Sequence, residues 1–269
     1  MIMSKIEDAL RKASADPLQP DRGRGGAQYG YARALRNRGG DNARMEIAPP
    51  WTPAELEKRG IIDFNGRDRA GINAFRQLRT SLLRSAGSGN FTLAVTGVTS
   101  GSGTSFVARN LGVTFALDPT KTAIVVDCDR RNRSISQLPG PDPGPGLTEY
   151  LSDEEWPVET LIKPTGVPRM RVITVGGDAE GHGEVFTNPR LKTLLDHLKR
   201  RYSDRYVIVD TPPIAENADA RILAQLCDYV LIVVPYGRVS ESRVLAAMEA
   251  VGEGRLCGVV LNDDPALPL

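Results

Sequence analysis

The chain has 269 residues, of which 41% are hydrophobic, so it can bury one sizeable core and is not a wholly disordered protein. Its 34 basic and 33 acidic side chains nearly cancel, so no overall charge drives it onto nucleic acid or anionic lipid. The start, MIMSKIEDAL, lacks an apolar core of signal-peptide length, and no stretch approaches the roughly 18 apolar residues of a membrane span. The sequence predicts a cytoplasmic protein that does not bind nucleic acid.

Residues 1–60 are predicted to form a short helix followed by a tether. Ser4 and Glu7 make an S-x-x-E capping box, and apolar residues follow at helical spacing, which predicts an amphipathic helix over residues 4–13. An isolated helix of under about 12 residues is marginal in water, so this one needs a partner surface. Residues 14–60 lose the periodicity and are rich in Arg, Gly and Pro, a composition that favours a flexible, disordered tether over the alternative of a dedicated RNA or lipid binder.

Residues 61–269 are predicted to form one domain in which apolar strands alternate with helices. The predicted strands are 91–98, 122–128, 170–176, 206–211, 229–235 and 256–262, and the predicted helices are 66–86, 104–117, 188–201, 217–226 and 239–252. The strands lack a two-residue alternation, as expected when helices cover both faces of a sheet. This order predicts an α/β fold with a doubly wound, mostly parallel sheet, and a ligand site beyond the carboxyl ends of its strands.

A glycine-rich turn joins the first of these strands to the following helix. Gly101 and Gly103 let backbone N–H groups turn inward, and the helix N-terminus adds partial positive charge, so the turn would attract a phosphate.

The turn matches the phosphate-binding pattern G-x-x-x-x-G-K-[ST] only in part. In the full pattern the lysine reaches the β- and γ-phosphates and the hydroxyl binds Mg²⁺. Gly103 and Ser105 match, but Val98 replaces the first glycine and Thr104 replaces the lysine. Taken alone, such a match does not distinguish a phosphate site from a turn that binds nothing.

Acidic residues at the ends of two other strands strengthen the case. Asp127 and Asp129 close the strand 122–128, with Arg131 just beyond, and Asp210 closes the strand 206–211. A Mg²⁺ ion that holds phosphates needs one or two carboxylates together with waters. Because the carboxyl ends of parallel strands meet at one edge of the sheet, the sequence predicts a nucleotide and Mg²⁺ site there.

Three segments resemble motifs of the bacterial tyrosine kinases (BY-kinases) of exopolysaccharide biosynthesis. The glycine-rich turn is similar to their Walker A motif, VVDCDRR to Walker A′ and VIVDTPP to Walker B, in the same order along the chain. The likeness extends through GLTEYLSD, NADARILAQLCDYVLIVV and CGVVLN, and so covers most of residues 61–269. The opening MSKIEDALRKA is similar to the exosortase-associated autokinase branch of that family. The resemblance implies a P-loop NTPase-like domain that uses ATP or ADP with Mg²⁺.

The resemblance also implies a role for each matching residue. The nucleotide would be bound by Gly101, Ser102, Gly103, Thr104 and Ser105, with Asn262 near the base. The metal would be held by Ser105, Asp127 and Asp210. The catalytic residues would be Asp127, Asp129, Arg131 and Asp210, with Arg131 facing the phosphates.

Two departures from the family predict impaired catalysis. A charged hydrogen bond to phosphate contributes roughly 1.5–3 kcal/mol, so Thr104 costs about one to two powers of ten in affinity, and more in rate because phosphoryl transfer depends on positioning and charge. The family's phosphorylated tyrosines cluster at the carboxyl terminus, whereas the last tyrosine here is Tyr236. Tyr29 and Tyr31 are either alternative acceptors or tether residues without a role.

The segment NAFRQLR (73–79) is similar to the family's E-x-x-R-x-x-R helix, which mediates ring assembly between subunits. Asn73 replaces its glutamate, so two interpretations stay open. The helix contributes to a homo-oligomer, or it simply packs Ile72, Phe75 and Leu82 on the core.

Three functional hypotheses follow. The first is a kinase-like component of exopolysaccharide polymerisation and export with impaired catalysis, held at the inner membrane by a membrane-bound copolymerase whose chain-length control it regulates. The second is a slow tyrosine autokinase or ATPase of the same pathway. The third is a partitioning or positioning ATPase, which is least favoured because that class carries an additional lysine where this chain has Thr99.

Overall fold

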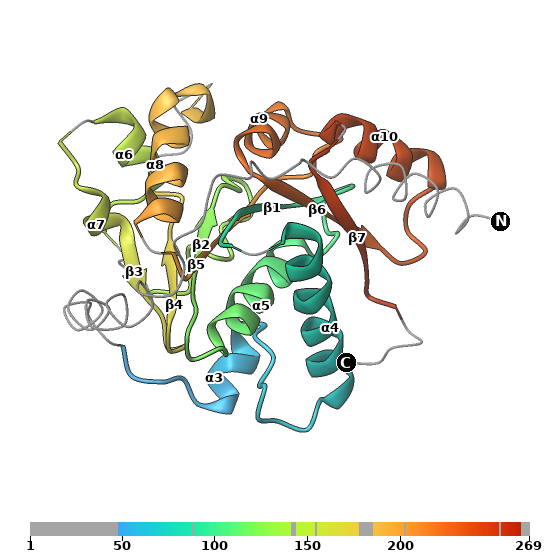
Figure 1. Cartoon of the computed structure of the whole chain (residues 1–269), viewed down its shortest axis with the longest axis horizontal. Helices are drawn as coiled ribbons and strands as arrows, with labels where there is room; N and C mark the ends of the chain where they lie inside the picture. The colour runs from blue at the N-terminus through green and yellow to red at the C-terminus, as the bar shows by residue number, and fades with distance from the viewer. Residues whose placement is uncertain are drawn as a thin grey trace, which may run out of the picture.

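The computed structural model describes residues 48–87, 89–140, 144–153, 155–177, 185–201, 203–252 and 254–264. The predicted helix 4–13 and the predicted tether as far as residue 47 lie outside the described residues, as do Tyr29 and Tyr31. Among the described residues, no helix is both long enough and apolar enough to cross a membrane. A seven-stranded sheet forms the centre of the protein, with helices packed on both of its faces (Figure 1).

The sheet confirms the prediction of a doubly wound, mostly parallel α/β fold. The six predicted strands are present, with shifted ends, as β1 (Thr92–Gly97), β2 (Thr122–Asp127), β4 (Met170–Ile173), β5 (Arg205–Asp210), β6 (Tyr229–Pro235) and β7 (Leu256–Asn262). The spatial order is β3-β4-β2-β5-β1-β6-β7, and only the pairing of β3 (Ile162–Pro164) with β4 is antiparallel. The three-residue β3 was not predicted, because so short a strand carries no readable pattern.

The five predicted helices are also present and divide between the two faces. They are α4 (Arg69–Ala86), α5 (Thr104–Ala116), α8 (Pro189–Arg200), α9 (Ala218–Leu226) and α10 (Glu241–Val251). In Figure 1, α4 and α5 lie below the sheet, and α8, α9 and α10 lie above it. Short elements that were not predicted are α6 (Leu147–Ser152), α7 (Val158–Leu161) and the 3-10 turn η2 (Val185–Thr187).

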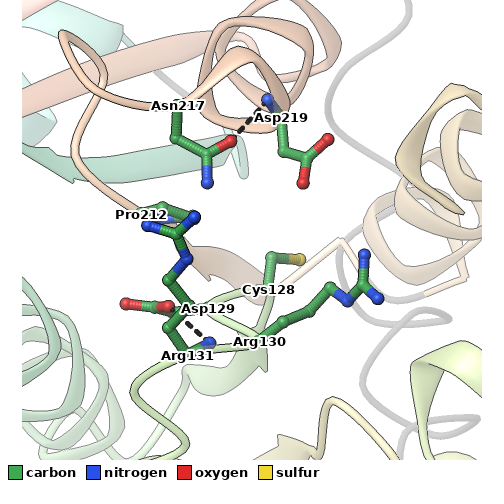
Figure 2. Close-up of a pocket in the computed structure, with 7 residues that line it drawn as sticks. All are labelled: Cys128, Asp129, Arg130, Arg131, Pro212, Asn217 and Asp219. Atoms are coloured by element: carbon green, nitrogen blue, oxygen red, sulfur yellow. Dashed lines mark hydrogen bonds between the residues drawn. The ribbon is translucent and has the colours of Figure 1, made fainter. Parts of the chain in front are cut away.

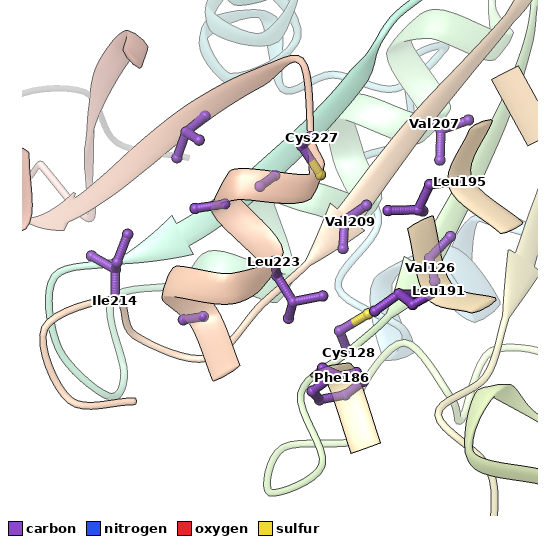
Figure 3. Packing of buried hydrophobic residues seen from close by; sticks show 14 of the residues in the cluster. Val126, Cys128, Phe186, Leu191, Leu195, Val207, Val209, Ile214, Leu223 and Cys227 are labelled. Atoms are coloured by element: carbon purple, nitrogen blue, oxygen red, sulfur yellow. The ribbon is translucent and has the colours of Figure 1, made fainter. Parts of the chain in front are cut away.

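Each face of the sheet has its own hydrophobic cluster, and the strands alternate between them. In β2, Ile124 and Val126 belong to the cluster under α8–α10, whereas Ala123 and Val125 belong to the cluster under α4 and α5. Figure 3 shows the first cluster, in which Cys128 lies beside Phe186 and Leu191. Because successive strand residues point to opposite faces, this alternation directs the next residue, Asp127, to the α5 face.

Residues 48–60, which the sequence analysis assigned to the tether, are ordered and pack on the core. Thr52 and Glu55 form a capping box at the start of α3 (Pro53–Lys58), with Pro53 in the first turn. The Trp51 backbone N–H donates to the Gly166 carbonyl at 3.0 Å. The proline and charged residues that favoured a tether are therefore the first turn and solvent-facing side chains of a short helix. We call residues 51–62 the strap.

Candidate nucleotide site

The glycine-rich turn has the backbone shape that its sequence predicts. β1 ends at Gly97 and α5 begins at Thr104, and between them Gly101 (φ 76°) and Gly103 (φ 87°) adopt left-handed conformations that glycine readily reaches. A side chain on Gly103 would collide with the Asn262 amide, which donates through Nδ2 to the Ser102 carbonyl at 3.1 Å. The structure thus brings Asn262, from the last strand, directly onto the turn.

Two hydroxyl groups of the turn, those of Ser102 and Thr99, have partners within the protein. Ser102 Oγ donates to the Thr99 carbonyl at 2.6 Å and accepts from the Thr99 N–H at 3.2 Å. Thr99 Oγ1 donates to Glu216 at 2.7 Å. Thr104 lies against the end of β1, because its Oγ1 would be only 2.7 Å from a Cβ placed on Gly97. The turn keeps a phosphate-binding shape, and the side chain at the lysine position is neutral.

Two predicted metal ligands, Asp127 and Asp210, stand side by side at the edge of the sheet. They are the last residues of β2 and β5 and are paired in register across those parallel strands. Asp210 follows Val207 and Val209 on one face and Tyr206 and Ile208 on the other, so alternation places it, like Asp127, on the α5 face. Both side chains are fully buried.

Asp127 is held by the loop that follows it. Its Oδ1 accepts from the Asp129 N–H at 3.1 Å, and its Oδ2 accepts from the Ser136 N–H at 2.8 Å and the Ser136 hydroxyl at 2.6 Å. Burial raises the pKa of Asp127 from 3.8 to about 7, and the hydrogen bonds from Ser136 and Asp129 oppose that rise. This carboxylate therefore shapes the loop as well as bordering the site.

Asp210 differs from its neighbour, because neither of its carboxylate oxygens has a hydrogen-bond partner of normal geometry. Burial raises its pKa well above the usual value, the charge of Asp127 raises it further, and the nearby Ser105 hydroxyl partly offsets the rise. Buried polar groups are nearly always paired, and buried charges are paired or bind a metal. The side chain of Asp210 therefore fits a cation.

The donor set suits Mg²⁺. Ser105 is buried in the first turn of α5, and its Oγ accepts from Asn132 Nδ2 at 3.5 Å. Mg²⁺ prefers hard oxygen ligands and completes its shell with waters and substrate phosphates, so it needs only one or two carboxylates. Consistent with that, no group of three or more His, Cys, Asp or Glu side chains within the described ranges is arranged to hold a metal by itself.

A cavity of about 550 Å³ opens at the same edge of the sheet (Figure 2). It is lined by Cys128, Asp129, Arg130, Arg131, Pro212, Asn217 and Asp219. Asp129 Oδ1 accepts from the N–H groups of Arg131 and Asn132, both at 3.1 Å, which fixes the turn after β2. In Figure 2 the side chains of Arg130 and Arg131 point in different directions, Arg131 towards Pro212. Two of the predicted catalytic residues, Asp129 and Arg131, therefore border this cavity.

Arg109 is a site residue that the sequence analysis missed. Its Nε donates to the Ser105 carbonyl at 3.0 Å, one Nη donates to the Arg59 carbonyl, and the other donates to Ser134 Oγ at 3.4 Å. Burial lowers the pKa of Arg109, and the negative charges of Asp210 and Asp127 oppose that effect. Its position four residues after Ser105, on the same helix face, is the signal that could have indicated it.

Comparisons with known proteins identify the family of the chain. No family model matches the chain. It is 30% identical over 191 residues to the tyrosine-protein kinase CpsD of Streptococcus agalactiae, which covers 70% of this chain and 80% of that protein. It is 32% identical over 198 residues to EpsB of Ralstonia solanacearum, named as a tyrosine-protein kinase, which covers 72% of this chain. The kinase domain of the Escherichia coli tyrosine kinase ETK superposes with a TM-score of 0.67 at 26% identity, covering 82% of this chain and 91% of that one.

The fold and the site define an α/β protein of the P-loop NTPase class. The defining features are the mostly parallel sheet, the glycine-rich turn before α5, and the paired aspartates at the ends of β2 and β5. Within that class, the chain belongs to the family of bacterial tyrosine kinases. It spans 26% of the length of EpsB, so it corresponds to a part of that relative.

Proposed function

We propose that this chain is a Mg²⁺-nucleotide-binding domain of the exopolysaccharide machinery whose phosphoryl transfer is weakened by Thr104. The observation that carries the proposal is the difference between two parts of the site, the buried Asp210 carboxylate and the turn that contains Thr104. Asp210 is buried without a hydrogen-bond partner of normal geometry, as a metal-binding carboxylate would be in the absence of its metal, while Thr104 places a neutral side chain at the lysine position of the turn.

The chain's own residues would divide the work. The backbone N–H groups of the turn and the N-terminus of α5 would bind the phosphates, and Ser105, Asp127 and Asp210 would hold Mg²⁺. When bound, Mg²⁺ neutralises charge on the phosphates. Asp129 and Arg131 line the cavity of Figure 2, where they would orient an acceptor hydroxyl and the phosphates. Asn262 would act through the turn, because its amide holds the Ser102 carbonyl.

The missing lysine decides the level of activity. Loss of one charged hydrogen bond to phosphate lowers affinity by about one to two powers of ten. Phosphoryl transfer relies on charge placed in the transition state, so its rate falls further. The protein would then act mainly as a nucleotide-sensing or structural subunit.

The proposed partner is a membrane-bound polysaccharide copolymerase at the inner membrane, whose chain-length control this cytoplasmic domain would regulate. Two observations support it. The chain belongs to the family of bacterial tyrosine kinases, and its motifs resemble those of the family's exopolysaccharide members. Its sequence also predicts an amphipathic helix over residues 4–13 that needs a partner surface. The predicted homo-oligomer through residues 73–79 stays a proposal beside it.

A second candidate is a slow autokinase or ATPase. The observation that favours it is that Ser105, Asp127 and Asp210, the three proposed metal ligands, lie together at one edge of the sheet. It predicts Mg²⁺-dependent turnover that is measurable in the wild type and disappears in Asp127→Asn.

Calorimetric titration of Mg-ADP and Mg-ATP into the wild type, Thr104→Lys and Thr120→Lys tests the leading proposal. Thr120→Lys is the matched control, because it adds the same charge at an exposed turn whose hydroxyl bonds only to Asp118. We expect Thr104→Lys to bind about 10 to 100 times more tightly than the wild type, and Thr120→Lys to match the wild type. A wild type that binds as tightly as Thr104→Lys, or that phosphorylates tyrosine as fast as that variant, contradicts an impaired site.

A further inference from the structure

We propose that Arg109 is a positioning residue of the nucleotide site, which clamps the first turn of α5 to the strap and to the loop after β2, and brings positive charge to the buried aspartates. The part of this inference that concerns nucleotide rests on the proposed function. The clamp itself does not, and it is tested separately below.

The clamp joins three segments that are far apart in the sequence. From α5, the Arg109 guanidinium donates to the carbonyl of Ser105 in its own first turn, to the carbonyl of Arg59 in the strap, and to the hydroxyl of Ser134. Ser134 lies in the loop that begins with Asp129 and ends at Ser136, the partner of Asp127. One planar group therefore fixes the helix turn that carries a proposed metal ligand against the loop that carries the proposed catalytic aspartate.

The strap is a firm anchor for this group. The neighbouring α5 residue, Asn110, donates through Nδ2 to the Gly60 carbonyl at 2.9 Å and accepts through Oδ1 from the Ile62 N–H at 2.8 Å. At the other end, the Arg59 guanidinium lies 4.4 Å from the centre of the Trp51 ring, and Trp51 bonds to Gly166. Two consecutive helix residues thus hold three backbone groups of the strap, which couples its position to the site.

Arg109 also changes the charge of the site. Two carboxylates that hold one Mg²⁺ leave a neutral centre, whereas the same centre with a guanidinium beside it carries a net positive charge. A positive centre attracts the polyphosphate of a nucleotide, and charges in a buried environment are screened less than those at the surface. Thr104 supplies no charge at the turn, whereas Arg109 brings a positive charge to the first turn of α5, where it bonds to the Ser105 carbonyl.

A purely structural arginine would stabilise the fold without affecting nucleotide binding. Arg169 is the comparison, because this exposed side chain donates through Nε and Nη2 to the Ala116 carbonyl, at 3.0 and 2.7 Å, at the opposite end of the same helix. Arg169→Ala therefore removes an arginine clamp from α5 far from the site.

The first measurement is Mg-ADP affinity by calorimetry in the wild type, Arg109→Ala, Arg109→Gln, Arg109→Lys and Arg169→Ala. We expect Arg109→Ala and Arg109→Gln to bind about 10 times more weakly, Arg109→Lys to stay within about 3-fold of the wild type because it keeps the charge, and Arg169→Ala to stay within about 2-fold. Arg109→Gln keeps a polar but uncharged side chain and Arg109→Lys keeps a long charged one, so they retain the test if the alanine variant fails to fold. Affinity in Arg109→Gln equal to that of the wild type, or a loss in Arg169→Ala as large as in Arg109→Ala, overturns the charge role.

The second measurement is hydrogen–deuterium exchange in the absence of nucleotide and metal. Arg109→Gln should exchange faster than the wild type in the strap around Ile62 and in the loop from Asn132 to Ser136, and Arg169→Ala should not. Unchanged exchange in both segments overturns the clamp. If the wild type does not bind Mg-ADP at all, the proposed function fails, and the exchange result alone then decides for or against the clamp.

Discussion

The two halves of the nucleotide site, the glycine-rich turn and the aspartate edge, differ in how their polar groups are satisfied. In the turn, the hydroxyls of Ser102 and Thr99 are bonded to the turn and to Glu216, and Thr104 lies against β1. At the aspartate edge, Asp210 is fully buried, and neither of its carboxylate oxygens has a hydrogen-bond partner of normal geometry. The hydroxyls of Ser102 and Thr99 therefore have partners without a ligand, whereas the aspartate edge holds a buried carboxylate that lacks a normal hydrogen bond.

This difference indicates which half of the site depends on a bound cation. A buried carboxylate without partners is costly to the fold, at about 1–3 kcal/mol or more for a charged group, so it is explained more readily by a bound cation than by stability. The turn has the left-handed glycines of a phosphate-binding turn, with the neutral Thr104 at the lysine position.

Asp210→Asn should have opposite effects on binding and on stability. Removing the charge removes a metal ligand, so we expect Mg-ADP affinity to fall by about 100-fold or more. In metal-free protein the same change removes an unpaired buried charge and should raise the free energy of unfolding by roughly 1–3 kcal/mol, as measured by urea denaturation. Asp228→Asn is the control for stability, because that carboxylate is paired with Lys199 and Thr92 and should lose stability on substitution. A destabilised Asp210→Asn would contradict the contrast.

The metal-free protein should lose stability as pH rises from about 4 to about 7. Burial raises the pKa of Asp127 from 3.8 to about 7, so the folded protein binds more protons than the unfolded chain in that window, and its stability declines with increasing pH. The slope reaches at most about 1.4 kcal/mol per pH unit for one such group. The raised pKa of Asp210 acts in the same direction. Urea denaturation across this range should show the decline, Asp127→Asn should reduce it, and Mg²⁺ should restore stability at the upper end. Stability that rises through this window without metal would refute the prediction.

Ser136→Ala should destabilise the protein by about 1–2 kcal/mol, because it removes the hydroxyl bond to Asp127 Oδ2 and the acceptor for the Val175 N–H. In the wild type this bond lowers the pKa of Asp127, so its removal should raise that pKa. The decline of stability with pH should then extend to higher pH. Thermal denaturation measures the first effect and its pH dependence the second. Ser152→Ala, which removes a single hydroxyl bond to the Thr148 carbonyl, is the matched control and should have the smaller effect. Equal effects in the two variants would argue against a special role for Ser136.

Thr99→Val should have the smallest effect. Its hydroxyl bonds to Glu216 at an exposed position, and such a bond contributes about 0.5 kcal/mol or less to stability. We expect the melting temperature to stay nearly unchanged and Mg-ADP affinity to stay within about 2-fold, because the phosphate would be bound by backbone groups of the turn. A large loss of affinity would show that the turn depends on this side chain rather than on its backbone.

The sequence predicted the parts of the fold that local pattern controls. Long runs of Val and Ile predicted the six main strands, and helical spacing predicted α4, α5, α8, α9 and α10. It missed β3, which depends on pairing with β4. It also missed α3, whose composition is that of a tether. The strap that contains α3 is held by contacts with residues distant in the sequence, from Trp51 to Gly166 and from Ile62 to Asn110.

The same division applies to the site. By itself, the sequence determined which chemical groups are present: the glycines of the turn, the aspartates that end β2 and β5, and a threonine in place of a lysine. The folded chain adds that Asp127 and Asp210 are paired across neighbouring strands, that Asp210 has no hydrogen-bond partner of normal geometry, and that Arg109 joins the strap to the site. The physical reason is that residue type and spacing govern local geometry, whereas burial and pairing depend on segments brought together by the whole sheet.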